Sequence, residues 1–143
     1  MICVDASVAA KWIFLEDFSE QAIALAADCA AAGEPIFGPV LLPLEITNTI
    51  RRRMLRDRLD LAEARVLLDL FSAFSVTIAE LGGLSEQALA LADSYGLPAV
   101  YDAYYIALAQ RMGCDLWTND RRLLHALGGK LPFVKLIGDY PLA

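Results

Sequence analysis

Short apolar runs alternate with longer segments that place apolar side chains at helical spacing along most of the 143-residue chain. The apolar runs predict buried strands, and the longer segments predict amphipathic helices. Strands are expected over residues 1–4, 35–37, 75–78, 114–118 and 133–137. Helices are expected over residues 7–15, 20–32, 41–56, 60–74, 85–95, 101–112 and 120–127. Because strands and helices alternate, the sequence predicts an α/β fold with a parallel sheet of five short strands, covered on both faces.

Several residues mark the expected ends of the helices. Ser7 and Ser19 are expected to cap the first two helices, because serine hydroxyls accept hydrogen bonds from free backbone N–H groups. Asp60 and Glu63 have the spacing of a capping box. Glycines directly follow three of the expected helices and indicate where these end: Gly33, Gly96 and Gly113.

The composition bounds the class of protein. A chain of 143 residues with 57% hydrophobic content is expected to form one domain over residues 1–143. No apolar run approaches the roughly 18 residues of a membrane span, and no basic segment precedes the first apolar run as in a secretory signal. The three cysteines are odd in number and widely spaced, which does not suit a disulfide framework. We expect them to be small buried hydrophobic residues in the reducing cytoplasm. We therefore expect a cytoplasmic protein without a membrane partner.

Four acidic residues occupy positions that the expected sheet brings to one edge. Asp5 follows the first strand and Asp120 follows the fourth, so both belong at the carboxyl ends of parallel strands, where ligands bind in such folds. Glu45 and Asp102 are isolated acids within apolar stretches of helices that start at the same edge. Each aspartate could instead cap a helix. Glutamate among apolar neighbours is rarely buried unless it is paired.

Together the four acids suggest a metal site. Clustered carboxylates raise one another's pKa, and a divalent cation removes that repulsion. Mg²⁺ and Mn²⁺ prefer oxygen ligands and usually keep several waters. Such a site can activate a water and orient a phosphodiester for in-line attack.

Four segments that contain these acids resemble the PIN-domain nuclease family, and most closely the VapC-type toxins of toxin–antitoxin pairs. The resemblance covers the whole chain, and the motifs occur in the family's order and spacing. The segments are Val4-Asp5-Ala6-Ser7, Leu44-Glu45-Ile46-Thr47-Asn48, Tyr101-Asp102-Ala103 and Thr118-Asn119-Asp120.

The resemblance implies a Rossmann-like α/β/α fold of three layers and an Mg²⁺- or Mn²⁺-dependent endoribonuclease. It implies four catalytic acids, Asp5, Glu45, Asp102 and Asp120, of which the three aspartates hold the metal. An acid, Asp102 or Glu45, would help to take the proton from the attacking water.

The resemblance also implies supporting residues and partners. Ser7 and Thr118 match positions whose hydroxyls hydrogen-bond the acids, and Asn48 lies one helical turn beyond Glu45, where it would touch substrate or metal-bound water. Many relatives carry another acid or asparagine where this chain has Arg121 and Arg122, so the number of metals stays open. The implied partners are an RNA substrate, a cognate antitoxin and a second copy of the chain.

The charge distribution bears on the RNA partner. Eighteen acidic and twelve basic residues give a net charge of −6, which argues against a simple electrostatic nucleic-acid binder. Half of the basic residues, however, lie between residues 51 and 65. They could form a solvated helical face, a basic flank that meets the RNA backbone, or a contact surface for a partner segment. The candidates for RNA or antitoxin contact are Arg51, Arg52, Arg53 and Arg56.

Other functions remain alternatives. A phosphatase could use Asp5 as a nucleophile, but that class usually has a second aspartate where this chain has Ser7. A PIN nuclease of RNA processing, or a PIN module that binds RNA or a partner without cutting, would share the fold. No phosphate-binding P-loop and no dinucleotide-binding glycine motif occurs in the sequence.

Overall fold

Five parallel strands form one sheet in a computed structural model that describes residues 1–143. The strand order is β3-β2-β1-β4-β5, and every neighbouring pair is parallel. The strands are β1 (Ile2–Val4), β2 (Ile36–Pro39), β3 (Thr77–Ala79), β4 (Asp115–Thr118) and β5 (Val134–Leu136). The predicted five-stranded parallel sheet is therefore confirmed.

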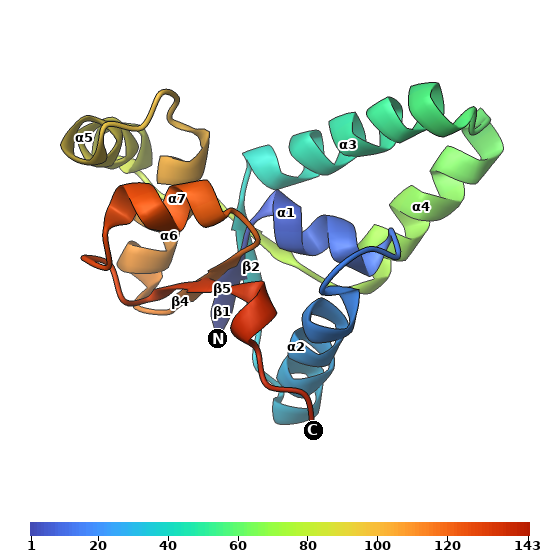
Figure 1. Ribbon diagram of the computed structural model, residues 1–143, viewed down its shortest axis with the longest axis horizontal. Helices are drawn as coiled ribbons and strands as arrows, with labels where there is room; N and C mark the ends of the chain where they lie inside the picture. Colours follow the sequence, from blue (N-terminus) through green and yellow to red (C-terminus); the bar gives the residue numbers. More distant parts are fainter.

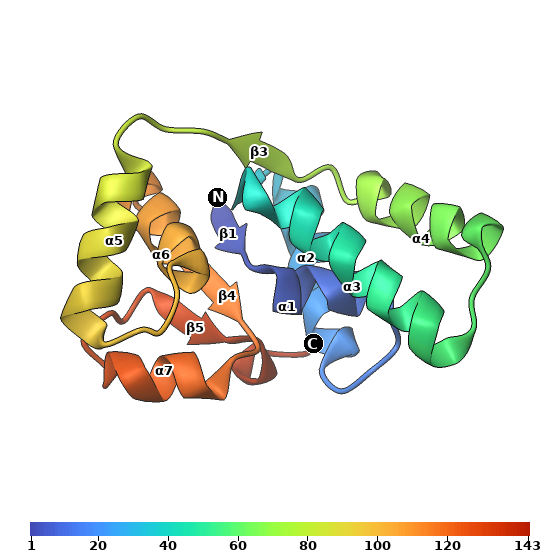
Figure 2. The same ribbon diagram turned by 90° about the horizontal axis from the view of Figure 1, so that it is seen from above.

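Helices cover both faces of this sheet and complete three layers (Figure 1). In both ribbon views α5 and α6 lie on one side of the sheet, and α1 and α2 lie on the other (Figure 2). Helices α3 and α4 form a hairpin that projects from the sheet on the side of α1 and α2. The α-helices are α1 (Ala6–Ala9), α2 (Ser19–Ala32), α3 (Leu41–Asp57), α4 (Leu61–Ala73), α5 (Leu84–Tyr95), α6 (Tyr101–Met112) and α7 (Arg121–Leu127). Two short 3₁₀ turns are η1 (Ala10–Trp12) and η2 (Ile137–Asp139).

The expected serine caps of the first two helices are wrong. Asp5 caps α1, because its side chain accepts the Val8 N–H, and the helix therefore begins at Ala6. The helical segment ends at Trp12, three residues earlier than expected. Ser19 lies inside α2, and its hydroxyl donates to the carbonyl of Phe14 and so fixes the preceding turn.

Other helix ends agree with the sequence signals. Asp60 and Glu63 form the predicted capping box at the start of α4. Gly113 ends α6 with a φ of +66°, a left-handed conformation that glycine adopts without strain. The strand expected from Ser75 begins only at Thr77, because Ser75 has a φ of +53° and cannot join an extended ladder.

The core lies on both sides of the two central strands. Cys3, Val4 and Leu116 are completely buried, as is Ile106 on α6. Burial on both faces explains why β1 is wholly apolar and why Leu116 and Trp117 occupy the middle of β4. None of the helices combines the length and hydropathy needed to cross a bilayer.

The register between the central strands positions the acidic edge. Val4 lies opposite Trp117, and the N–H of Asp5 donates to the carbonyl of Trp117 at 3.2 Å. Asp5 and Thr118 therefore leave the two strands at the same level, side by side.

Candidate functional site

Asp5 is the most deeply buried acid at the carboxyl edge of the sheet, with 6% of its surface exposed. Its Oδ1 accepts hydrogen bonds from Ser7 Oγ at 2.5 Å and from the N–H of Val8 at 3.1 Å. Burial raises the pKa of Asp5 to about 6, and the carboxylate of Asp102 adds to the rise. Hydrogen bonds from Ser7, Thr118 and Val8 oppose the rise by stabilising the ionised form. The fold thus buries the Asp5 carboxylate without a salt bridge to a lysine or arginine.

Ser7 and Thr118 tie the ends of β1 and β4 together around this carboxylate. Ser7 Oγ donates to Asp5 and accepts the N–H of Asn119 at 2.8 Å. Thr118 is completely buried, and its hydroxyl bonds to Asp5 while it accepts the N–H of Asp120 at 3.0 Å. Both hydroxyls therefore fix the orientation of Asp5 relative to the Asp120 backbone.

Asp102 and Asp120 lie at the starts of two helices, and the charge of Asp120 acts on Asp102. Asp102 is in the first turn of α6, where burial raises its pKa and the negative charge of Asp120 raises it further. Asp120 caps α7, and its Oδ1 accepts the N–H groups of Arg122 and Leu123 at 2.9 and 3.1 Å. The cap occupies one oxygen of Asp120 and leaves Oδ2 outside these bonds, so capping is compatible with a second role.

Glu45 lies on α3, close enough to Asp102 for the two charges to interact. Burial raises the pKa of Glu45, the repulsion from Asp102 adds to this, and the positive charge of Arg52 opposes it. Tyr105 donates its hydroxyl to Glu45 Oε1 at 2.8 Å, and this bond also lowers the pKa. Glu45, Asp102 and Asp5 therefore share one electrostatic environment, although they come from three separate elements.

Tyr105 is a site residue that the sequence analysis missed. Only 2% of the Tyr105 surface is exposed, and its hydroxyl donates to Glu45 from α6. Tyr105 follows Asp102 by three residues on α6, a spacing that places both on the same helix face. That spacing was the available signal, but the apolar neighbours of Tyr105 also suit an ordinary core position.

A polar hollow of about 340 Å³ adjoins Glu45. Ser7, Glu45, Asn48, Arg52 and Asn119 line it, so it opens between α1, α3 and the end of β4. The predicted supporting residue Asn48 thus lies in the same hollow as Ser7 and Glu45.

The four arginines of α3 occupy different environments. Arg52 lines the hollow, whereas Arg51 is exposed outside it. Arg53 pairs with Glu16 at 3.0 Å, and its guanidinium lies 4.3 Å from the ring centre of Phe14. These contacts tie Arg53 to the loop before α2.

Arg56 also has a partner on its own helix. Its Nε lies 2.9 Å from Asp57 Oδ1. Among the four arginines, Arg52 is therefore the one that lines the hollow beside the acids.

The donor set suits a hard divalent cation that keeps much of its water. No three acidic, cysteine or histidine side chains converge into a complete set of metal ligands. The four acids nevertheless offer only oxygen donors, and burial together with repulsion from neighbouring carboxylates raises the pKa of Asp5, Glu45 and Asp102. Mg²⁺ is commonly held by one or two carboxylates and several waters, which fits this arrangement.

Comparison with known proteins gives a consistent family match. A family model described as "PIN domain" matches residues 2–129. The chain is 34% identical over 123 residues to the protein named VapC ribonuclease Mb0985 from Mycobacterium bovis (strain ATCC BAA-935 / AF2122/97). It has the same identity to proteins named Ribonuclease VapC9 from Mycobacterium tuberculosis, in strains CDC 1551 / Oshkosh and ATCC 25618 / H37Rv. Each alignment covers 86% of this chain and 88% of the relative.

Proposed function

The chain belongs to the PIN domain family, and from this membership we propose that it is a metal-dependent endoribonuclease of the VapC toxin type. The observation that carries the proposal is the electrostatic coupling of Asp5, Glu45, Asp102 and Asp120 at the carboxyl edge of the sheet. Buried carboxylates that repel one another have little structural value by themselves. Their grouping is explained by binding a cation.

Asp5, Asp102 and Asp120 are the residues that would hold Mg²⁺ or Mn²⁺. When bound, the cation supplies a water of lowered pKa and a Lewis acid for the phosphodiester. Ser7, Thr118 and the N–H of Val8 keep Asp5 in one orientation. The three aspartates therefore form the binding part of the site.

Glu45 is the residue that we assign to proton transfer. The Tyr105 hydroxyl donates a hydrogen bond to Glu45 Oε1, so Glu45 Oε2 is the oxygen that can take a proton from the attacking water. The raised pKa of Glu45 makes it a stronger base than an exposed glutamate. Asn48 and Arg52 line the adjacent hollow, where the amide can bind substrate and the guanidinium can face a phosphate.

The proposed partners are RNA, a cognate antitoxin and a second copy of the chain, in the cytoplasm. Large apolar side chains are exposed along the α3–α4 hairpin, and this favours a protein partner that binds there. Leu44 is 71% exposed, Leu55 66% and Val66 65%. Apolar surface of this kind is typical of interaction sites.

The test is cleavage of single-stranded RNA by the purified chain with Mg²⁺, with Mn²⁺ and with EDTA. We expect cleavage with either cation, none with EDTA, and none by the Asp5→Ala variant if its folding is intact. Binding of RNA without cleavage under all conditions would indicate a binding module. Trapping of an aspartyl-phosphate at Asp5 would instead indicate a phosphatase. Growth arrest on expression would distinguish a toxin from a nuclease of RNA processing.

A further inference from the structure

Two cysteines are in contact between β1 and the start of β4, beneath the edge that carries the acids. The Sγ atoms of Cys3 and Cys114 are 3.5 Å apart, although the residues are separated by 111 positions in the sequence. Cys3 belongs to β1 and is completely buried, whereas Cys114 precedes β4 and is half-buried. The pairing of β1 with β4 therefore brings one accessible and one inaccessible thiol into contact.

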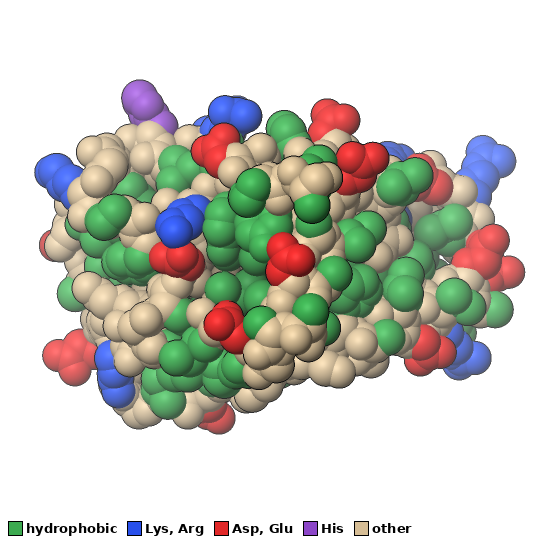
Figure 3. Space-filling view, turned by 90° about the horizontal axis from the view of Figure 1, so that it is seen from below, with side chains coloured by type: hydrophobic (Ala, Val, Ile, Leu, Met, Phe, Trp, Pro, Cys, Tyr) green, Lys and Arg blue, Asp and Glu red, His purple; other side chains and the backbone are tan.

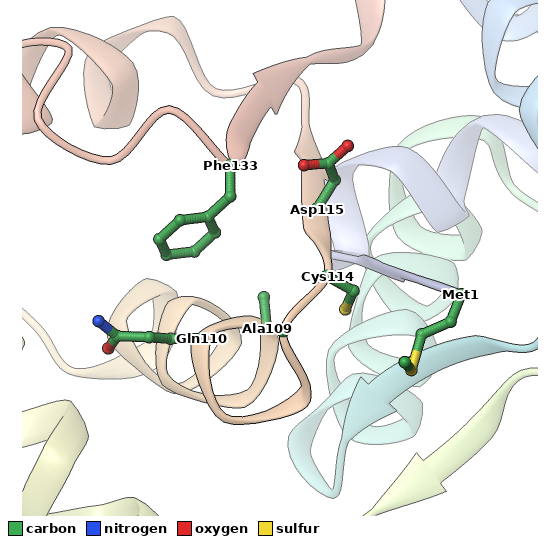
Figure 4. Close-up of a pocket in the computed structure, with 7 residues that line it drawn as sticks. Met1, Ala109, Gln110, Cys114, Asp115 and Phe133 are labelled. Carbon is green, nitrogen blue, oxygen red and sulfur yellow. The ribbon is translucent and has the colours of Figure 1, made fainter.

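A hollow of about 360 Å³ gives access to Cys114. Met1, Asp115 and Phe133 are among its lining residues, and Figure 4 shows them around the Cys114 side chain. The lower face of the molecule, where the strands begin, has hydrophobic side chains gathered at its centre (Figure 3). A small uncharged reagent can therefore reach Cys114, while Cys3 lies behind it.

The contact also favours the reactive form of Cys114. The hydrogen bond between the two sulfurs lowers the pKa of Cys114, and the backbone N–H of Cys3 adds to this, while burial opposes it. Cys29 is different, because burial raises its pKa and no second sulfur is close to it. Thiolates, not thiols, are the nucleophiles in reactions with peroxides and disulfides. The three cysteines thus differ in access, ionisation and partner.

We propose that Cys3 and Cys114 form a peroxide-reactive dithiol that closes to an intramolecular disulfide. The Cys114 thiolate attacks one oxygen of hydrogen peroxide, the O–O bond breaks, and the departing hydroxide takes up a proton to give water. Cys114 is then a sulfenic acid. The Cys3 sulfur attacks the Cys114 sulfur, the S–O bond breaks, and the second water leaves with the Cys3 proton. The two sulfurs together lose two electrons, and the peroxide is reduced to two waters.

The movement that this reaction needs is small. The sulfurs must approach from 3.5 Å to about 2.05 Å, the length of a disulfide bond. Cys114 lies outside β4, so its movement breaks no strand pairing. The oxidation is detected from thiol and disulfide masses, so its measurement does not depend on the proposed nuclease activity.

The test is mass spectrometry of the reduced chain after treatment with hydrogen peroxide and alkylation in denaturant. We expect a mass decrease of about 2 Da before alkylation, one alkylated cysteine instead of three, and a Cys3–Cys114 linked peptide. Cys29→Ala should keep the link, whereas Cys3→Ala and Cys114→Ala should lose it. The reaction should be faster in the folded chain than in urea, because only the fold brings the two sulfurs together.

Three results would overturn the proposal. The first is a chain that keeps three free thiols under peroxide concentrations that oxidise free cysteine. The second is Cys114 sulfinic acid beside a reduced Cys3. The third is a disulfide that includes Cys29 or joins two chains. Because the wild-type chain provides the main measurement, a variant that fails to fold does not affect the outcome.

Discussion

Replacing Asp5 with asparagine should abolish RNA cleavage and yet stabilise the protein without metal. Asp5 has an ordinary pKa of 3.8 and a pKa of about 6 in the folded chain. A rise of about two units corresponds to about 3 kcal/mol of unfavourable charge burial at neutral pH. Asparagine carries no charge, and its carbonyl oxygen can still accept from Ser7 and Val8.

The sign of this effect sets its pH dependence. Between about pH 4 and pH 6 the folded chain binds the Asp5 proton more tightly than the unfolded chain, so stability falls as the pH rises. Above this window the full loss is present in the wild type and absent in Asp5→Asn. Below it the two proteins should have similar stability.

The assay is urea unfolding in EDTA at pH 4 and at pH 8. We expect Asp5→Asn to unfold at a higher urea concentration at pH 8, with a gain of about 3 kcal/mol that nearly disappears at pH 4. Mg²⁺ should narrow the gap at pH 8, because ligand binding to the folded wild type stabilises it. Asp60→Asn is the matched control, since Asp60 also caps a helix but is exposed.

Two results would contradict a destabilising charge at Asp5. If Asp5→Asn were no more stable than the wild type at pH 8, burial of the Asp5 charge would not destabilise the fold. If the gain persisted unchanged at pH 4, it would have a cause other than charge.

Three further predictions concern the site and the core. Tyr105→Phe removes the hydrogen bond to Glu45, worth about 1.5 kcal/mol for a charged acceptor, so kcat should fall about tenfold and the pH–rate profile should shift to higher pH. Arg52→Gln should weaken RNA binding to the Asp5→Asn protein about tenfold in an anisotropy titration, while Arg51→Gln, outside the hollow, should change it little. Leu116→Ala, in the buried centre of β4, should lower the free energy of unfolding by about 2–5 kcal/mol in urea.

Local patterns in the sequence were sufficient for the elements and for the edge at which the acids lie. Hydrophobic spacing and the Asp60–Glu63 capping box depend only on nearby residues, and these predictions are confirmed. The first two helix starts were wrong for a related reason. Ser7 and Ser19 suit a cap equally well, but their hydroxyls are used by Asp5 and Phe14 instead.

Patterns within single segments were enough to predict the α/β class, the parallel sheet and the acids that follow its strands, because each depends on the hydrophobic spacing and the turn residues of one segment. Which distant side chains meet depends instead on how the strands and helices pack. The strand order and the β1–β4 register place Asp5 beside Thr118 and Cys3 beside Cys114. The packing of α3 against the rest of the molecule brings Glu45 to Tyr105, 60 residues away. Such contacts arise from packing of the whole core, which no local pattern encodes.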